Sequence, residues 1–353
     1  MIYYLVTAEH SYTMESYLQS WGRKLIDRIQ LLFYEELPKL RRLPAGTYIF
    51  SDLERLSPQQ KAFAAEVWKQ LAATGNGVRL LNHPMRCVLR YQLLQALHES
   101  GQNDFRAVRA TEARALDRFP VFIREENEHT GNINGLLRNQ DEVDEALANL
   151  VTQGYSLDSL LVIEFCETSD STGVYRKYAA FMVGGTIVPR TLIFGHDWCL
   201  KVTDLGTEEM LREERDYREQ NPDEPWLRKM FNLAGIDYGR IDYGLLGNKP
   251  QVWEINTNPM VLLLPKEYTP VHLPAQKEFA RCIIPAFEAL DCRQPVVAST
   301  QISIPPELLR GLPGLSRART FRRFARRIKN SVLVKPNVSV LARHWQVQGS
   351  GPW

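Results

Sequence analysis

The sequence predicts a mixed α/β and α+β fold for this chain of 353 residues. Residues 1–85 alternate short apolar runs with helical stretches, a pattern typical of an open α/β layer with a parallel sheet. Residues 120–165 alternate strand and helix again, and residues 175–260 have the pattern of an antiparallel sheet interrupted by one charged insertion. Together these observations predict several layers and more than one domain.

Two polar residues of the N-terminal region stand where ligands often bind in parallel sheets. Asp52 and His83 each follow an expected strand. For either residue alone, a role in a turn or a helix cap is favoured. The elements expected here are strands at 3–7, 48–51 and 78–81 and helices at 58–73 and 85–100.

Composition favours a folded, cytoplasmic enzyme. Hydrophobic residues make up 44% of the chain and charged residues 24%, as in ordinary globular proteins. The five cysteines are odd in number and show no CxxC spacing, which argues against a disulfide framework or a cysteine zinc site. Residues 1–6 have the pattern of a first strand rather than a signal peptide, and no apolar run is long enough to span a bilayer.

Charge is distributed unevenly along the chain. The net charge is +2, but ten basic and no acidic residues follow Glu307, which leaves about −8 on the rest. Residues 321–328 have apolar side chains at helical spacing, so a basic amphipathic helix is expected. Such a helix can lie on an anionic membrane, bind nucleic acid or dock on an acidic surface. Docking on the acidic body or on a partner subunit is preferred, and a nucleic-acid function is not expected.

Residues 239–259 carry the most informative pattern of the sequence. Strands are expected from 241 and at 252–256, with a turn at 247–250. Because side chains alternate along a strand, Glu254 and Asn256 share one face, and Asp242 on the partner strand can be brought to it. Three hard oxygen donors suit a Mg²⁺ ion that also binds nucleotide phosphates. The alternative is an ordinary hairpin whose polar residues are only solvated.

This hairpin, with Asp242, Glu254-x-Asn256 and then Pro259, resembles the last core strands of the ATP-grasp superfamily. Upstream segments resemble other family elements in the right order, and this shared order over residues 80–290 carries the resemblance. In chain order they are a strand at 119–124 whose terminal basic residue reaches phosphates, a flap with Gly131 and Gly135, a hinge strand at 160–166 that receives adenine, and a hairpin at 175–185.

The resemblance implies ATP and one or two Mg²⁺ ions as cofactors. Arg124 and Arg90 stand where the family commonly has lysine, and arginine keeps the charge and suits phosphate oxygens. The implied site comprises Asp242, Glu254 and Asn256 on the metal, Arg124, Arg90 and Lys201 on phosphate, Arg240 on the transferred phosphoryl group, and Glu164, Phe165 and Cys166 around adenine.

The implied activity is ligation of a carboxylate to an amine through an acylphosphate. A phosphotransferase on the same fold and a non-catalytic ATP-binding protein remain the alternatives. The acceptor would be a small molecule or a peptide, and homodimers are frequent among such enzymes. The implied architecture is an N-terminal open α/β (pre-grasp) domain at 1–85, a small lobe at 86–163, a large lobe with the metal site at 164–295, the two lobes clasping ATP, and a basic, helical C-terminal extension at 296–353.

Two segments near the expected site have open assignments. The charged insertion at 207–223 has opposite charges at i to i+4 spacing, which favours a solvated helix, with a lid or an acceptor-binding element as the alternative. His196 and Asp197 are candidates for acceptor binding or proton transfer, with an exposed turn as the alternative.

Overall fold

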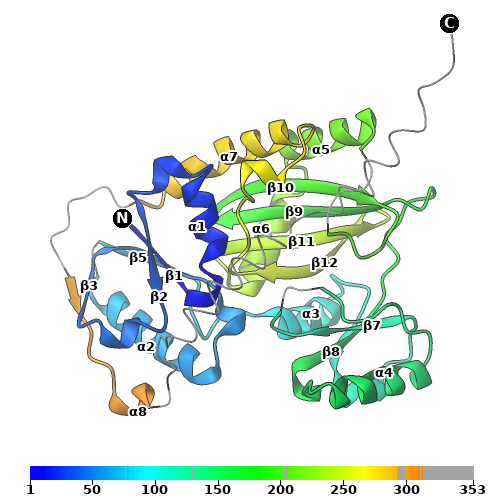
Figure 1. Cartoon of the computed structure of the whole chain (residues 1–353), viewed down its shortest axis with the longest axis horizontal. Helices are drawn as coiled ribbons and strands as arrows, with labels where there is room; N and C mark the ends of the chain where they lie inside the picture. Colours follow the sequence, from blue (N-terminus) through cyan, green and yellow to red (C-terminus); the bar gives the residue numbers. More distant parts are fainter. Residues whose placement is uncertain (76, 129–130, 202–205, 292–298, 311, 313–353) are drawn as a thin grey trace, which may run out of the picture.

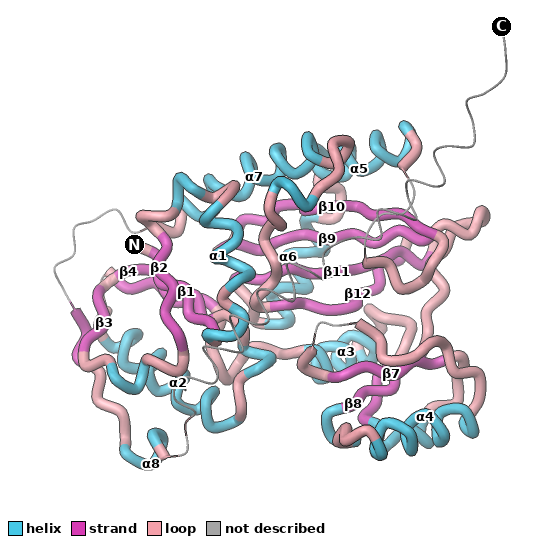
Figure 2. The backbone as a smooth tube through the Cα atoms, viewed as in Figure 1, coloured by secondary structure: helices cyan, strands magenta, loops and turns pink. Residues whose placement is uncertain are grey.

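A computed structural model of the chain describes residues 1–75, 77–128, 131–201, 206–291, 299–310 and 312 (Figures 1 and 2). Within these ranges the strands form one parallel sheet and three antiparallel ones. The expected combination of an open α/β layer with further α+β layers is therefore confirmed. The expected basic helix at 321–328 lies outside the described residues.

The N-terminal sheet is parallel and has the strand order β2-β1-β4-β5. Helix α2 starts where expected because Ser57, the N-cap residue before Pro58, forms a capping box with Gln60 in the first turn. A short antiparallel pair of β3 with β13 lies beside this sheet. The elements of this region are β1 (Ile2–Val6), α1 (Tyr12–Gln19), β2 (Ile29–Phe33), β3 (Arg42–Pro44), β4 (Gly46–Phe50), α2 (Pro58–Ala73), β5 (Val78–Leu81), β13 (Ser299–Gln301) and α8 (Pro306–Leu309).

The second sheet is antiparallel, with β8 between β6 and β7. Helix α4 covers one of its faces through Val143, Leu147 and Leu150, and Asn139 caps its first turn. This agrees with the expected strand and helix alternation at 120–165. Its elements are α3 (Arg90–Glu99), β6 (Ala107–Arg109), β7 (Val121–Glu125), α4 (Gln140–Thr152) and β8 (Leu160–Glu164).

The largest sheet is antiparallel in the order β10-β9-β11-β12 and lies above the second sheet in Figure 1. Its two faces have different partners because side chains alternate along each strand. Tyr178 and Met182 pack toward α3 and α6, whereas Phe181 packs toward α7 and the N-terminal sheet. Its elements are β9 (Tyr175–Val183), β10 (Thr186–Gly195), α5 (Glu208–Gln220), α6 (Glu224–Ala234), β11 (Tyr238–Leu246), β12 (Lys249–Asn256) and α7 (Leu273–Glu288).

The charged insertion forms helix α5, but this helix is not solvated on all sides. Both α5 and α7 lie along β10 (Figure 1). The Tyr217 hydroxyl donates to the carbonyl of Ala179, and Glu214 accepts from the Thr191 hydroxyl at 3.0 Å. In the described part of the chain, no helix is long and apolar enough to cross a membrane.

Candidate functional site

A cavity of about 400 Å³ is bounded by the ends of β7 and β8 and by strands β9, β11 and β12. Of the residues that the resemblance assigns to metal, phosphate and adenine, all except Arg90 line this cavity. Residues up to 132 positions apart along the chain (256 − 124) are thus brought together at one cavity. The lining residues from that expectation are Arg124, Glu164, Phe165, Cys166, Lys201, Arg240, Asp242, Glu254 and Asn256.

The polar floor of the cavity follows from the pairing of β11 with β12. Asp242 lies directly opposite Glu254, and Arg240 lies opposite Asn256. The intervening Ile241 is fully buried in the core on the other face of the sheet. Strand alternation therefore sends both carboxylates and the amide to the cavity, as expected from the sequence.

Two cations hold the Asp242 carboxylate. Arg240 donates through Nε to Oδ1 at 2.6 Å and through its terminal nitrogen to Oδ2 at 3.0 Å. The Lys177 ammonium lies 2.8 Å from the same Oδ2. Burial opposes ionisation of Asp242, but the two cations outweigh it and hold the pKa of Asp242 below its usual value.

Two further cations hold the Glu254 carboxylate. Arg90 donates to its Oε2, and Arg124 lies 3.2 Å from the same oxygen. The Arg124 side chain is only 12% exposed. Burial, and then the charge of Arg90, lower the pKa of Arg124 to about 10, so its guanidinium is still charged at neutral pH. Each carboxylate on the cavity floor is therefore shared by two cations.

Arg90 lies behind the cavity rather than in its lining. One terminal nitrogen donates to the carbonyls of Glu125, Glu126 and Glu128 at 3.1, 2.5 and 2.8 Å. The side chain is 3% exposed. Arg90 thus ties the start of the flap to Glu254, a contact that the sequence did not indicate.

The chemistry of the donor set fits a magnesium ion. Asp242, Glu254 and Asn256 offer carboxylate and amide oxygens, the ligands that Mg²⁺ prefers. The Asn256 Oδ1 atom accepts from the backbone N–H of Asn258 at 2.8 Å, which fixes the amide. Among the described residues no group of three His, Cys, Asp or Glu side chains converges to hold a metal, so this set of two carboxylates and one amide is the candidate.

Aromatic rings also line the cavity. Trp198 lies 5.0 Å from Phe122 and 5.6 Å from Phe165, measured between ring centroids. It follows β10, whereas the two phenylalanines lie on β7 and at the end of β8, so it bridges the two sheets. Sequence patterns assign no role to Trp198, because only the tertiary fold places these three rings together.

Glu164 contributes to the cavity wall while its carboxylate is bound elsewhere. Arg106 donates to it from the backbone N–H and from Nε, both at 2.9 Å. The side chain is 1% exposed. Burial raises the pKa of the neighbouring Cys166 to about 11, so this thiol is neutral at physiological pH.

The flap reaches the cavity through Gly131. Its φ of +103° lies in the region that favours glycine, and an added Cβ would lie 2.9 Å from Cε of Lys201. The backbone at Asn132 forms an antiparallel bridge with Arg124, which brings the flap back over β7. Gly131 and Lys201, two residues expected near the phosphates, are therefore neighbours.

His196 and Asp197 do not line the cavity. The His196 ring contacts the carbonyl of Gly173 at 3.2 Å, and the Asp197 carboxylate accepts from the backbone N–H of Cys199 at 2.9 Å. Both contacts are exposed and local. They fit the exposed turn that was the alternative for this segment.

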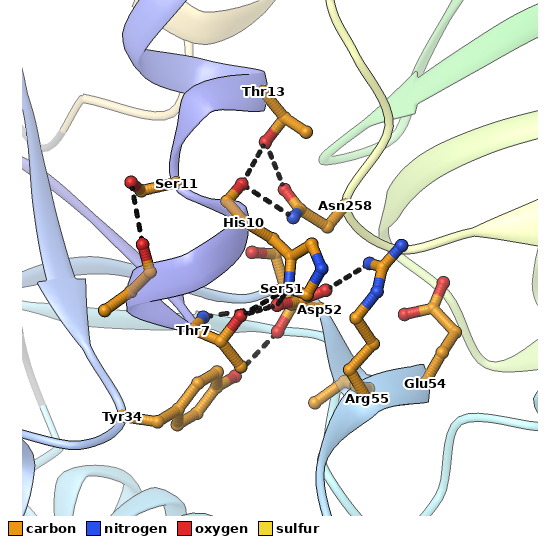
Figure 3. A network of polar contacts seen from close by, with 12 residues as sticks. Thr7, His10, Ser11, Thr13, Tyr34, Ser51, Asp52, Glu54, Arg55 and Asn258 are labelled. Carbon is orange, nitrogen blue, oxygen red and sulfur yellow. Dashed lines mark hydrogen bonds and ion pairs between the residues drawn. The ribbon is translucent and has the colours of Figure 1, made fainter. Parts of the chain in front are cut away.

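Asp52 belongs to a buried polar network at the end of β4, shown in Figure 3. It has a left-handed backbone with φ of +59° and is fully buried. Thr7 donates to it from its backbone and its hydroxyl, and Arg55 lies 2.6 Å from its Oδ1. Partners within the fold therefore satisfy Asp52, in line with the favoured turn role. His83 likewise accepts from the backbone N–H of Met85 at 3.1 Å.

The same network anchors the chain just beyond Asn256. The Asn258 amide oxygen accepts from the hydroxyls of Tyr4 at 2.8 Å and Thr13 at 2.7 Å (Figure 3 shows the Thr13 contact). Thr257 is bound by Glu54 through both its backbone N–H and its hydroxyl. The N-terminal sheet thereby fixes the end of the strand that carries Glu254.

Solved structures with a similar arrangement include three whose names refer to ligases or to the ATP-grasp fold. A Bacillus anthracis D-alanine–D-alanine ligase complexed with ATP shares 16% identity over 80% of this chain and 97% of its own, with a TM-score of 0.42. A RimK domain ATP-grasp protein from Sphaerobacter thermophilus shares 14% identity over 84% of this chain and 99% of its own, with a TM-score of 0.43. An L-amino acid ligase from Bacillus licheniformis shares 12% identity over 72% of this chain and 66% of its own, with a TM-score of 0.37.

The likeness concerns the arrangement of the backbone alone. No family model and no curated protein matches this chain.

Proposed function

We propose that this chain is an ATP- and Mg²⁺-dependent ligase of the ATP-grasp type, which activates a carboxylate as an acylphosphate for attack by an amine. The observation that carries the proposal is the pairing of Asp242 with Glu254 on the floor of a cavity that also holds Arg124, Lys201 and Arg240. Paired carboxylates among several cations suit a magnesium-bound polyphosphate.

The cations have distinct tasks in this proposal. Arg124 and Lys201 neutralise phosphate oxygens, and the contact of Lys201 with Gly131 brings the flap to the same point. Arg240 lies beside Asp242, where its planar guanidinium can stabilise the phosphoryl group during transfer. Mg²⁺ held by Asp242, Glu254 and Asn256 would compensate the charge of the phosphates.

The adenine base is assigned to the aromatic end of the cavity. Phe165 and Trp198 form apolar walls on two sides, and the backbone of Phe165 and Cys166 supplies polar contacts. Glu164 shapes this wall and is held in place by Arg106. This assignment puts the base and the phosphate-binding cations in one cavity.

The reaction has two steps. A carboxylate oxygen of the substrate attacks the γ-phosphorus of ATP and ADP leaves, so an acylphosphate forms. An amine then attacks the acyl carbon, an amide bond forms, and inorganic phosphate leaves. Phosphoryl transfer depends mainly on positioning and electrostatic stabilisation, which is the part that the described side chains supply. The acceptor is proposed to be a small molecule or a peptide.

The proposed division of the chain follows the sheets. Residues 1–85 contain the parallel sheet, 86–163 most of the second sheet, and 164–295 the largest sheet with the candidate metal ligands. The extension at 296–353 is proposed to dock on an acidic surface of this chain or of a second copy in a homodimer.

Release of phosphate and ADP on adding carboxylate and amine acceptors tests the proposal. The ligase reading requires ADP and free phosphate in equal amounts, both dependent on acceptor, and loss of both in Asp242→Asn. Glu66→Gln is the control, because this carboxylate lies on α2, where its partners are Lys69 and Gln70, and does not line the cavity. Release of ADP without free phosphate, with the phosphoryl group kept on the acceptor, identifies a phosphotransferase. Stabilisation by ATP without turnover for any acceptor identifies a non-catalytic ATP-binding protein.

A further inference from the structure

Lys177 is a central cation of the cavity that the proposed function leaves without a task. Its strand, β9, pairs with β11 so that Ala179 lies opposite Asp242. Lys177 precedes Ala179 by two residues and therefore emerges on the same face of the sheet. Its ammonium reaches Oδ2 of Asp242 at 2.8 Å and lines the cavity.

We infer that Lys177 is an exchangeable counter-ion, which neutralises Asp242 until a divalent cation binds and then moves to the phosphate oxygens of the bound nucleotide. This inference rests on the proposed function, since it assigns a residue to the same metal and phosphate site. It gives Lys177 two successive partners, the carboxylate of Asp242 and an anionic ligand.

The four cations on the two carboxylates differ in how firmly they are held. Arg240 is fixed by two hydrogen bonds, one to each oxygen of Asp242. Arg90 is 3% exposed and also donates to three backbone carbonyls of the flap. Arg124 is 12% exposed and lies against both Glu254 and Arg90. These three guanidiniums are built into the wall of the site.

Lys177 is held least firmly of the four. It meets Asp242 through one ammonium contact, and its side chain is 27% exposed, the largest value in the set. A lysine ammonium on a flexible four-carbon stem can change partners without a backbone movement. The open side of this residue is the cavity itself.

Electrostatics gives the direction of the exchange. A divalent cation on Asp242 and Glu254 adds two positive charges to a cluster that already holds four. Like charges a few ångströms apart repel strongly where water is scarce. Moving the Lys177 ammonium away from Asp242 relieves that repulsion and opens one side of Oδ2 for coordination, while Arg240 keeps its contact with the same oxygen. A polyphosphate arriving with the metal then offers the ammonium a new anionic partner.

The inference predicts opposite effects of one substitution on two ligands. Lys177→Met keeps a long apolar stem and removes the competing charge. The variant should therefore bind Mn²⁺ alone, measured by electron paramagnetic resonance on the full chain without nucleotide, at least about fivefold more tightly than the wild type, within the range typical of coupled binding. At saturating Mn²⁺, its affinity for inorganic tripolyphosphate should fall by at least about fivefold, for the same reason.

Three further variants make the outcome unambiguous. Lys177→Arg retains the charge and should keep Mn²⁺ affinity near that of the wild type. Lys69→Met removes a lysine from an ion pair on α2 and should change the affinity for neither Mn²⁺ nor tripolyphosphate. Asp242→Asn should lose Mn²⁺ binding if the metal site is where it is proposed. Thermal melting of each variant, followed by circular dichroism, confirms that it is folded.

Failure of the inference and failure of the proposed function give different results. If Mn²⁺ binds through Asp242 but Lys177→Met leaves its affinity unchanged or lowers it, the role of Lys177 is overturned and the metal site stands. If the wild type does not bind Mn²⁺, or Asp242→Asn binds it equally well, the metal site of the proposed function is wrong and the inference falls with it. Tighter binding of Mn²⁺ together with weaker binding of tripolyphosphate by Lys177→Met supports both the metal site and the role of Lys177.

Discussion

Glu54 binds Thr257 at two points: its Oε1 accepts from the backbone N–H at 2.6 Å, and its Oε2 accepts from the hydroxyl. The two residues are 203 positions apart in the chain. Glu54 lies just beyond β4 of the N-terminal sheet, whereas Thr257 directly follows the last candidate metal ligand, Asn256. The position of the cavity floor is thus determined in part by a carboxylate of another sheet.

Glu54→Gln is expected to lower the free energy of unfolding by about 2 kcal/mol, because a hydrogen bond to a buried charged group contributes about 1.5–3 kcal/mol. The variant should also bind Mn²⁺ more weakly, since Asn256 loses its anchored neighbour. Urea denaturation and Mn²⁺ titration measure the two effects. Glu66→Gln, in the exposed pair on α2, should change stability by less than about 0.5 kcal/mol. Equal effects of both variants would contradict the anchoring role.

Glu254→Gln should destabilise the fold by about 3 kcal/mol, because it leaves the buried charges of Arg90 and Arg124 without a carboxylate. Adding Arg124→Met to this variant should recover part of the loss. Chemical denaturation of the wild type, both single variants and the double variant gives the coupling energy. A double variant whose loss equals the sum of the single losses would show that the three charges are not coupled.

Asp52→Asn should make stability less dependent on pH in acid. Burial opposes ionisation of Asp52, but His10 and Arg55 hold its pKa below the usual value. Its contribution is therefore complete above about pH 4, the value for an unfolded chain, and is lost as the pH falls through the folded pKa. Asparagine tolerates the left-handed backbone of this position.

At pH 7 the variant should lose about 3 kcal/mol, as expected when one partner of a buried ion pair is removed. The difference between wild type and variant should shrink below pH 4. Urea denaturation at pH 7, 5, 4 and 3 measures it. A difference that stays constant over this series would mean that Asp52 acts through its shape and not its charge.

Gly131→Ala should weaken ATP binding about fivefold and destabilise the fold by about 1 kcal/mol, because alanine is strained at this positive φ. Its methyl group would also displace Lys201 from its place beside the flap. Gly135→Ala in the same flap is a matched control, since its Cβ would meet no heavy atom within 4 Å. Isothermal titration with ATP and urea denaturation compare the pair, and equal affinities would remove the flap from the phosphate site.

Local patterns predicted much of the fold. The expected helix at 58–73 has the bounds of α2, and the expected strand at 78–81 has those of β5, because capping residues and turn residues mark both elements. The hairpin of β11 and β12 was predicted from alternation and a turn. Alternation placed Glu254 and Asn256 on one face and allowed Asp242 to reach it, whereas the pairing of Asp242 with Glu254 depends on the register of the two strands.

The partners of the site residues were not accessible in this way. Lys177 meets Asp242 only because β9 pairs with β11 in one register, and that register is fixed by packing on both faces of the sheet. The guanidinium of Arg90 was expected at phosphate, yet it donates to carbonyls of a loop 35 residues or more away. Such contacts depend on the tertiary fold, and short sequence patterns do not predict which distant residues will meet.

The bond between Glu54 and Thr257 restricts how this protein can be recombined. A chimera that takes its N-terminal sheet from a relative would bring a foreign residue to position 54 while keeping Thr257 and Asn258 in the recipient. Residues 54, 257 and 258 must therefore be exchanged together, although they are far apart in the sequence. The same holds for Tyr4 and Thr13, which donate hydrogen bonds to Asn258. Exchange of the first 85 residues should therefore succeed only between chains that match at both sides of this junction.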